Sequence, residues 1–309
     1  MRKDIATGVT ICLLLMIVAT NVPVIGSLSA LLLPPAVLFF RLRLGPEKGV
    51  AVPAAAWVAV ALVSGPATTD MLVMAALMVL GYGLGHLINR GWPLEAVVIG
   101  ACTLSLAAGT AAVFMASALA GQGVVAMIDA QVGQHLTTAM ALYRSMGIGE
   151  EQLQTLADNI DQIRYVLVRL LPGLAVMAVL VASWISLLIA RPLLARLAMP
   201  ATGFGPLRLW KAPDQLVWAA IACGALLILP GRDLKILGLN GIVVLMTVYF
   251  FQGMAIVAFV FDKKRFPRPL RGAFYGLIAV QQMLVLLIVA AGFFDIWLNF
   301  RKLNNQQPP

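Results

Sequence analysis

Long apolar runs separated by short charged clusters dominate the pattern of this chain. Residues 5–40 contain no charged side chain. This length suits two membrane-spanning helices, because about 20 apolar residues cross a bilayer as a helix. The proline and glycine between Asn21 and Gly26 disfavour one continuous helix, so we expect spans at about 5–21 and 24–40. Further runs lie at about 50–64, 71–89, 95–119, 166–190, 213–230, 237–261 and 272–294.

These runs predict an all-α fold: a polytopic transmembrane helical bundle of about nine spans, with eight as the alternative. The sizeable polar segment, residues 120–165, carries apolar residues at helical spacing on both sides of Met146-Gly147-Ile148-Gly149. It therefore predicts an extracytoplasmic amphipathic helical hairpin, either a cap on the outer membrane face or a lid or docking surface. The expected organisation is an N-terminal transmembrane bundle (1–119), the hairpin (120–165), a C-terminal transmembrane bundle (166–298) and a polar tail (299–309).

Composition supports a membrane location. Hydrophobic residues make up 61% of the chain and charged residues 11%, whereas soluble domains carry about 25% charged residues. The formal net charge is +9, but the basic residues fall in short loops between apolar runs rather than on one basic face. Most lie on one side when the N-terminus is placed in the cytoplasm, as the positive-inside rule requires. We therefore expect a multi-pass protein of the bacterial cell (inner) membrane, with membrane lipid as a partner and no nucleic acid.

Catalytic and metal-binding patterns are absent from the sequence. Cys12, Cys102 and Cys223 stand alone in separate apolar runs, and His86 and His135 lack ligand-spaced partners. Motifs of hydrolases, metalloproteases and nucleotide-binding loops do not occur. We expect no enzyme activity, no metal and no cofactor.

A glycine pair and several polar residues lie inside the apolar runs. Gly81 and Gly85 form a GxxxG pattern, which predicts close helix packing. An unpaired amide in hydrocarbon costs several kcal/mol, so buried polar side chains must either join helices or contact a ligand. The candidate ligand-contacting residues are Asn240, Gln252, Gln281, Gln282 and Arg169.

Charged residues at the ends of the runs are explained by solvation and topology. This interpretation covers the carboxylates of Asp70, Glu95, Asp214 and Asp295. The dense basic loop 262–271 fits ordinary topology signalling, and binding of anionic lipid or an acidic partner is the alternative.

Short motifs along the chain support a family resemblance. In the N-terminal part they are Pro23 to Gly26, Pro34-Pro35 and Leu44 to Gly49, and in the middle Leu171-Pro172. The later motifs are Pro206 to Asp214, Leu239-Asn240-Gly241, Tyr249 to Gly253, Gly292 to Asp295 and Phe300-Arg301-Lys302. In this order they resemble the YybS-like family of uncharacterised bacterial multi-pass membrane proteins.

The N-terminal part also looks like the substrate-binding (S) components of energy-coupling-factor vitamin transporters. That resemblance rests on the proline-glycine break after the first span, the proline-bearing second span and the loop Gly45-Pro46-Glu47-Lys48-Gly49. It implies binding of a small vitamin or metal ion from outside and docking on a membrane coupling protein.

Two functions follow from these observations. The first is transport-class binding of a small solute from the outer face. An outward-open polar cavity lined by Gln252 or Gln281 would favour this function. The second is a non-transporting scaffold or regulator that binds other membrane proteins, for which a tightly filled bundle would speak.

Overall fold

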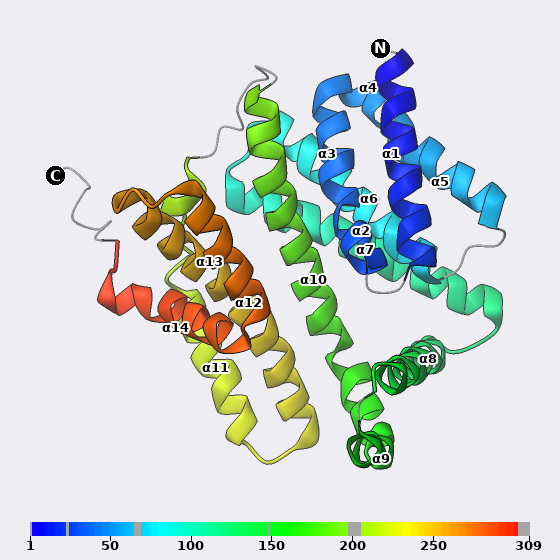
Figure 1. Cartoon of the computed structure of the whole chain (residues 1–309). Helices are drawn as coiled ribbons and strands as arrows, with labels where there is room; N and C mark the ends of the chain where they lie inside the picture. The colour runs from blue at the N-terminus through cyan, green and yellow to red at the C-terminus, as the bar shows by residue number, and fades with distance from the viewer. Residues whose placement is uncertain (1, 23–24, 65–68, 148, 197–204, 302–309) are drawn as a thin grey trace. The chain divides into compact units, whose positions relative to one another are not determined.

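The computed structural model describes residues 2–22, 25–64, 69–147, 149–196 and 205–301 (Figure 1). Within these ranges all regular secondary structure is helical and there is no strand, so the predicted all-α class is confirmed. The chain forms two compact units, Met1–Gly203 and Phe204–Pro309. Each unit is described by itself.

Ten helices of the first unit fall in the described residues. They are α1 (Arg2–Asn21), α2 (Ile25–Leu31), α3 (Leu33–Leu44), α4 (Pro46–Gly49), α5 (Ala51–Ser64), α6 (Thr69–Asn89), α7 (Leu94–Ala120), α8 (Val124–Ser145), α9 (Glu150–Asp158) and α10 (Ile160–Arg196).

Helix α3 lies at the centre of this unit, where it packs against α1, α6 and α10. Its residues Leu33 and Val37 are fully buried in an apolar cluster with Cys12 and Met16 of α1. A Cβ atom added to Gly81 of α6 would lie 2.3 Å from the Pro34 carbonyl oxygen. The backbones of α3 and α6 therefore touch at a glycine, which confirms the packing role predicted for the GxxxG pattern.

The unit boundary differs from the expected grouping of residues 166–298 into one C-terminal bundle. Helix α10 packs against α3, α6 and α7, so the apolar run 166–190 belongs to the first unit. The expected grouping followed the order of the runs along the chain. The apolar surface of the 37-residue helix α10 instead packs against helices that precede the hairpin.

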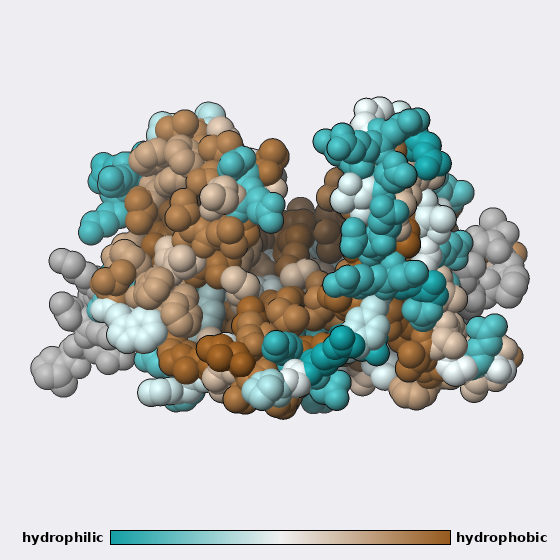
Figure 2. Space-filling view, turned by 90° about the horizontal axis from the view of Figure 1, so that it is seen from below, coloured by the Kyte–Doolittle hydropathy of each residue, from teal (hydrophilic) through white to brown (hydrophobic). Residues whose placement is uncertain are grey.

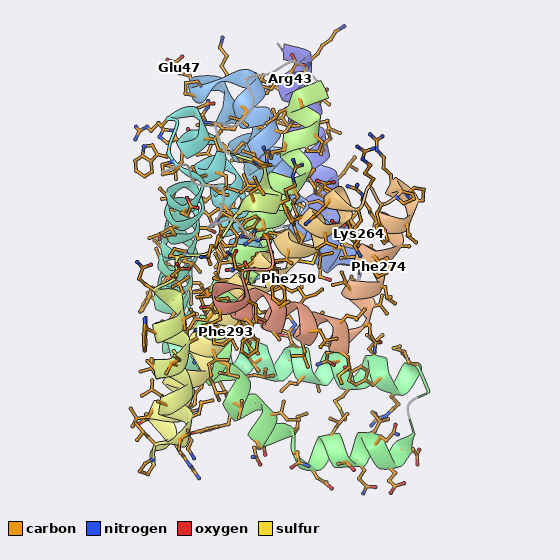
Figure 3. All side chains as sticks on the ribbon, turned by 90° about the vertical axis from the view of Figure 1, so that its left-hand side faces the viewer. Arg43, Glu47, Phe250, Lys264, Phe274 and Phe293 are labelled. Atoms are coloured by element: carbon orange, nitrogen blue, oxygen red, sulfur yellow. The ribbon has the colours of Figure 1, made fainter. Side chains whose placement is uncertain are left out.

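The expected hairpin is present as α8 and α9, which lie crosswise to α10 (Figures 1 and 3). Its second arm differs from the prediction, because α9 ends at Asp158 and α10 begins at Ile160 and runs on through the following apolar segment. Arg164 of α10 forms an ion pair with Asp129 of α8, with Nε 2.9 Å from Oδ1. No residue of α8 is buried, and Figure 2 shows hydrophilic residues gathered over this hairpin.

The second unit contains a short 3-10 helix and four α-helices in its described part. They are η1 (Leu207–Leu209), α11 (Leu216–Ile228), α12 (Arg232–Lys263), α13 (Arg268–Val280) and α14 (Gln282–Leu298). Helix α12 packs against α11, α14 and η1.

The last expected span, 272–294, is not one straight helix. Helices α13 and α14 meet at an angle of 102°, and Gln281 at the junction has an extended backbone, with φ −96° and ψ 102°. Its N–H donates to the Leu277 carbonyl at 2.8 Å, while its own carbonyl accepts the N–H of Leu284 at 3.0 Å. Gln281 therefore ends one helix and begins the next, which corrects the prediction of a continuous span.

Fewer helices are long enough to cross a membrane than the nine spans that were predicted. Six segments of the described chain are long and apolar enough to cross a membrane, or seven if the bent α13–α14 pair is one span. The expected spans 50–64 and 213–230 appear as α5, with 14 residues, and α11, with 13 residues. At about 1.5 Å per residue, such helices are shorter than a hydrocarbon core of about 30 Å. The count of full-length spans is thus lower than the nine expected, although the multi-pass helical fold is the one predicted.

Candidate functional site

The second unit encloses a charged cluster formed by Gln252, Asp295 and Arg301, here called the Arg301 cluster. The three residues are 0%, 4% and 2% exposed, respectively. Arg301 Nη2 donates to Asp295 Oδ2 at 2.8 Å, and Gln252 Nε2 donates to the same oxygen at 3.2 Å. The buried Arg301–Asp295 ion pair thus accepts an additional hydrogen bond from the side-chain amide of Gln252.

Backbone groups occupy much of the remaining hydrogen-bonding capacity of the cluster. The Gln252 Oε1 accepts the Ala212 N–H at 3.2 Å, and Arg301 Nη1 donates to the carbonyls of Trp210 at 2.7 Å and Arg208 at 3.2 Å. The Phe300 N–H donates to the other Asp295 carboxylate oxygen at 3.0 Å. These bonds hold the segment around η1 against α12 and α14, so the cluster is arranged to join chain segments.

Two glycines allow α12 and α14 to cross closely next to this cluster. A Cβ atom on Gly292 would lie 2.0 Å from the Tyr249 carbonyl oxygen, and one on Gly253 would lie 2.1 Å from the Ile288 carbonyl oxygen. Gly253 and Gly292 are near neighbours in sequence of Gln252 and Asp295. The close crossing therefore sets the distance across which the amide reaches the carboxylate.

The structure corrects the interpretation of two charged residues. Asp295 was expected at a solvated span edge and Arg301 in a polar tail, yet both are buried. The turn that makes this arrangement is Asn299, whose φ of 43° ends α14 in the left-handed conformation. The sequence motifs Pro206 to Asp214, Tyr249 to Gly253, Gly292 to Asp295 and Phe300-Arg301 all supply atoms to the cluster or its bonds. The occurrence of these four motifs in one chain was the sequence signal from which the cluster could have been predicted.

Of the other predicted ligand-contacting residues, Asn240, Gln281 and Gln282 lie in the second unit with Gln252, and Arg169 lies in the first unit. Asn240 donates to the Ile236 carbonyl of its own helix at 2.9 Å. Gln281 and Gln282 are exposed at the α13–α14 junction. Arg169 is exposed in the first unit, where its guanidinium lies 3.4 Å from the centre of the Tyr165 ring. Within the second unit, Gln252 therefore has partners that do not include Asn240, Gln281 or Gln282, and ligand contact by the five candidates stays a prediction.

A second buried arginine, Arg41 of α3, lies in the first unit and is 1% exposed. Arg41 directly follows the uncharged stretch 5–40 and was expected, like the other basic residues, in a short loop between apolar runs; its burial corrects that interpretation. Arg41 Nη2 lies 3.3 Å from His86 Nδ1. Since a guanidinium only donates hydrogen bonds, His86 accepts at Nδ1 and carries its proton on Nε2. The guanidinium also lies 5.0 Å from the centre of the Tyr82 ring.

Glycines make room for this arginine. A Cβ atom on Gly85 of α6 would lie 2.8 Å from Arg41 Cγ, and one on Gly49 of α4 would lie 2.9 Å from Arg41 Cα. The side chain is thus closely packed, but its Nε and Nη1 are buried without a hydrogen-bond partner among the described residues. An uncompensated buried polar group costs about 1–3 kcal/mol, and a charged one costs more.

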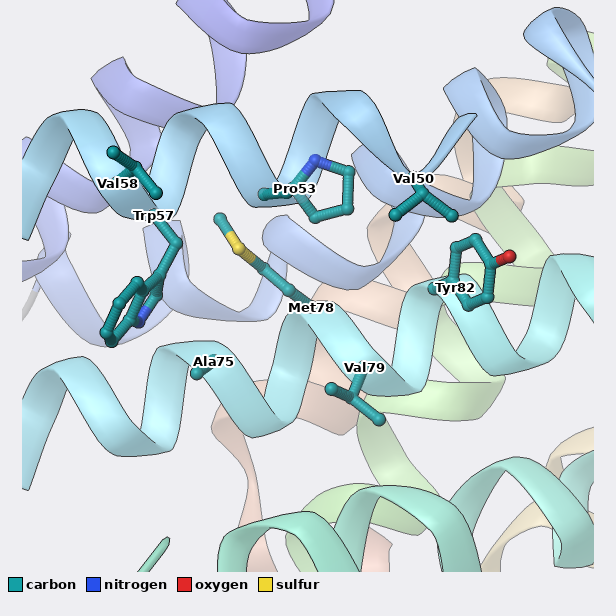
Figure 4. Close-up of a pocket in the computed structure, with 9 residues that line it drawn as sticks. Val50, Pro53, Trp57, Val58, Ala75, Met78, Val79 and Tyr82 are labelled. Carbon is teal, nitrogen blue, oxygen red and sulfur yellow. The ribbon is translucent and has the colours of Figure 1, made fainter. Parts of the chain in front are cut away.

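An apolar groove between α5 and α6 lies next to this arginine. Its volume is about 400 Å³, within the range of about 300–1,000 Å³ found for small-molecule sites. Figure 4 shows Val50 and Tyr82 at one end of the groove and Trp57 and Val58 at the other. Its lining consists of Val50, Pro53, Ala54, Trp57, Val58, Ala75, Met78, Val79 and Tyr82.

Tyr82 connects the groove with the arginine, because its ring lines the groove and also contacts the Arg41 guanidinium. It stacks on His86 one helical turn later, with ring centres 6.2 Å apart. The first unit therefore combines an apolar, aromatic-lined surface with a neighbouring buried cation. Sequence reasoning missed this site, because the runs 50–64 and 71–89 were considered only as membrane spans and not as the walls of a groove.

No metal site is evident in the described chain, where no three His, Cys, Asp or Glu residues are grouped so that they could hold an ion.

Comparison with known proteins identifies relatives without assigning an activity. Residues 10–296 match the model of a family described as predicted membrane proteins, DUF2232. The chain is 27% identical over 253 residues to the uncharacterised protein YybS of Bacillus subtilis (strain 168), which covers 80% of each chain. The resemblance to the YybS-like family is thereby confirmed, whereas the likeness to S-components stays a prediction. No solved structure matches the chain.

Proposed function

The chain belongs to the DUF2232 family of predicted membrane proteins, and from this premise we propose that it binds a small apolar or amphiphilic molecule within the membrane as a transport-class protein. The observation that carries the proposal is the groove of about 400 Å³ between α5 and α6. Apolar walls with a few aromatic side chains are typical of small-molecule sites. Trp57 and Tyr82 supply such aromatic surface near opposite ends of the groove (Figure 4).

The apolar groove favours an apolar solute over the polar one that a cavity lined by glutamines would bind. A polar cavity lined by Gln252 or Gln281 would have suited a vitamin-like polar solute. Gln252 instead lies in the Arg301 cluster, and Gln281 lies exposed at a helix junction. The proposed ligand is therefore one that gains from leaving water, at about 25 cal/mol per Å² of apolar surface buried.

A matched pair of substitutions on α5 tests this proposal. Ala54 lines the groove, whereas the neighbouring Ala55 does not, and both are exposed. We expect Ala54→Trp to fill the groove and to lower the affinity for a long-chain alcohol, hexadecanol, about tenfold or more, since its apolar contacts are replaced. Ala55→Trp should leave the affinity unchanged. Binding that is absent from the unmodified protein, or equal in the two variants, would contradict the proposal.

The second candidate function is a scaffold or regulator that binds other membrane proteins. The observation in its favour is the hydrogen-bonded Arg301 cluster, which joins segments of the second unit rather than lining a solute path. Chemical crosslinking in native membranes would support this function if it recovered the same protein partner repeatedly.

Orientation and cellular location complete the proposal. The chain lies in the bacterial cell membrane with its N-terminus in the cytoplasm and performs no catalysis. The basic residues of the short loops support this orientation. The start of α1 and the α8–α9 hairpin lie at opposite ends of the first unit (Figure 1). With a cytoplasmic N-terminus the hairpin then faces outward, and α5 counts as a short crossing segment. A cysteine introduced at Gln122, before α8, should therefore react with a membrane-impermeant thiol reagent in intact spheroplasts. Labelling only after lysis would reverse the assignment.

A further inference from the structure

The unpaired donors of Arg41 lie beside the apolar groove, and together they define a ligand more closely. In the part of the chain that the structure describes, Arg41 Nε and Nη1 have no hydrogen-bond partner, although the residue is only 1% exposed. The one hydrogen bond of its guanidinium in the described chain runs from Nη2 to His86. A neutral imidazole satisfies one donor, and no carboxylate of the described residues pairs with the positive charge.

We infer that the Arg41 guanidinium binds the anionic head, a carboxylate or phosphate, of an amphiphile whose apolar chain occupies the α5–α6 groove. This inference rests on the proposed function, because it names the ligand class of the same groove. Guanidinium is well suited to such a head, since its N–H donors form a planar fork that matches the oxygens of a carboxylate or phosphate.

Geometry supports the connection between head and chain. The groove ends at Val50 and Tyr82, and Gly49, next to Val50, packs directly against Arg41. The Tyr82 ring separates the groove from the guanidinium and lies 5.0 Å from it. For an anionic head to reach Nε or Nη1 from the groove, the half-buried Tyr82 side chain must rotate away from Arg41.

The size of the groove limits the ligand. Its volume of about 400 Å³ lies at the lower end of the usual range of about 300–1,000 Å³, which favours one apolar chain over two. Free phosphate or acetate offers the same head chemistry without the chain, so the experiment must separate these ligands.

The test compares two ligands that share a chain and differ in the head. Binding of palmitate and of hexadecanol is measured on the full-length protein in a maltoside detergent. We expect palmitate to bind about tenfold more tightly than hexadecanol, the effect of one charge-assisted hydrogen bond. Hexadecyl phosphate in place of palmitate then shows which anionic head is preferred. Acetate and inorganic phosphate at millimolar concentration should not displace palmitate.

Variants assign the preference to Arg41. Arg41→Gln should remove the preference for palmitate while leaving hexadecanol affinity unchanged. Arg43→Gln is the matched control, because Arg43 is two residues away, has a side chain that is 43% exposed, and pairs with Asp4 at 2.7 Å. It should keep the preference. If Arg41→Gln does not fold, the comparison of palmitate with hexadecanol on the unmodified protein still tests whether the site prefers an anionic head.

The outcomes separate this inference from the proposed function. Equal affinities for palmitate and hexadecanol, both lowered by Ala54→Trp, would overturn the inference and keep the groove as a binding site. Displacement of palmitate by acetate or phosphate would overturn the inference that the ligand is an amphiphile and would indicate a site for a free anion. Hexadecanol binding that Ala54→Trp does not change would overturn the proposed function itself.

Discussion

Arg41 and Arg301 are buried to nearly the same degree, yet their surroundings differ. Arg301 donates to a carboxylate and to two backbone carbonyls. With the described residues as possible partners, Arg41 donates to one imidazole and leaves Nε and Nη1 unpaired, whereas Arg301 leaves Nε alone unpaired. Burial alone therefore does not reveal what a buried charge does.

The difference separates two uses of a cation in an apolar environment. A buried charge with an ion-pair partner and backbone acceptors fixes the positions of chain segments, and removal of either partner leaves the other uncompensated. A buried charge without an anion costs stability but is ready to bind one. The contacts of the Arg301 cluster are those of a stabilising element in the second unit, whereas the role proposed for Arg41 is ligand binding in the first.

The largest expected effect comes from removing the carboxylate of the Arg301 cluster. Asp295→Asn leaves the Arg301 cation buried without its counterion and should lower the free energy of unfolding by about 3–5 kcal/mol. The measurement is denaturant unfolding of the purified protein in detergent micelles.

The control for this substitution is Asp214→Asn. Asp214 pairs with Lys211 at 2.8 Å, but its side chain is 62% exposed, so the change should stay below about 1 kcal/mol. Equal losses in the two variants would show that the Arg301 cluster contributes no more than a surface pair.

A smaller loss is expected where α12 and α14 cross. The Cβ atom of Gly292→Ala would lie 2.0 Å from the Tyr249 carbonyl oxygen. The backbones must separate, which should cost about 1–3 kcal/mol in the same unfolding experiment. Gly224→Ala on α11 meets no atom within 4 Å and should leave stability unchanged or raise it by up to about 1 kcal/mol. A stable Gly292→Ala protein would mean that the crossing tolerates expansion.

Replacing each arginine by methionine tests the comparison directly. Arg41→Met removes a buried charge that pairs with no carboxylate of the described ranges, so the ligand-free protein should be equally stable or more stable by about 1 kcal/mol. Arg301→Met should be destabilised, because Asp295 is left buried and unpaired. Thermal unfolding of the two variants in detergent gives the signs. A destabilised Arg41→Met would assign Arg41 to structure rather than to binding.

The smallest effect is expected at the hairpin. Asp129 and Arg164 join α8 to α10, but their side chains are 43% and 35% exposed, so solvent screens the pair. Asp129→Asn should change stability by less than about 1 kcal/mol, and high salt should abolish the difference. Hydrogen exchange of α8 amides at low and high salt measures this contribution. A loss that persists at high salt would point to a different role for Asp129.

Much of the secondary structure was predictable, because each apolar run long enough to cross a bilayer is helical for a local reason. Hydrocarbon leaves the backbone no hydrogen-bond partner outside the segment. The expected runs at 71–89 and 95–119 correspond to α6 and α7, and the polar segment 120–165 contains the first arm of the hairpin. The role of Gly81 in close packing was also predictable from its spacing with Gly85.

The candidate site was not predictable in the same way. Gln252 was recognised as a buried amide, but its partners Asp295 and Arg301 were assigned to solvent because they lie near the end of an apolar run. Their burial depends on the turn at Asn299 and on the glycine crossing of α12 and α14. Arg41 was assigned to a loop for the same reason, since no local pattern shows that Gly49 and Gly85 pack around it.

The sequence by itself determined that this is a helical, multi-pass membrane protein of a recognisable family, because length and apolar character act within each segment. Only the tertiary structure decided which charges are buried, which helices bend and where a groove forms. These properties depend on distances between residues that are far apart along the chain, such as Gln252 and Asp295, and local periodicity contains no information about such distances.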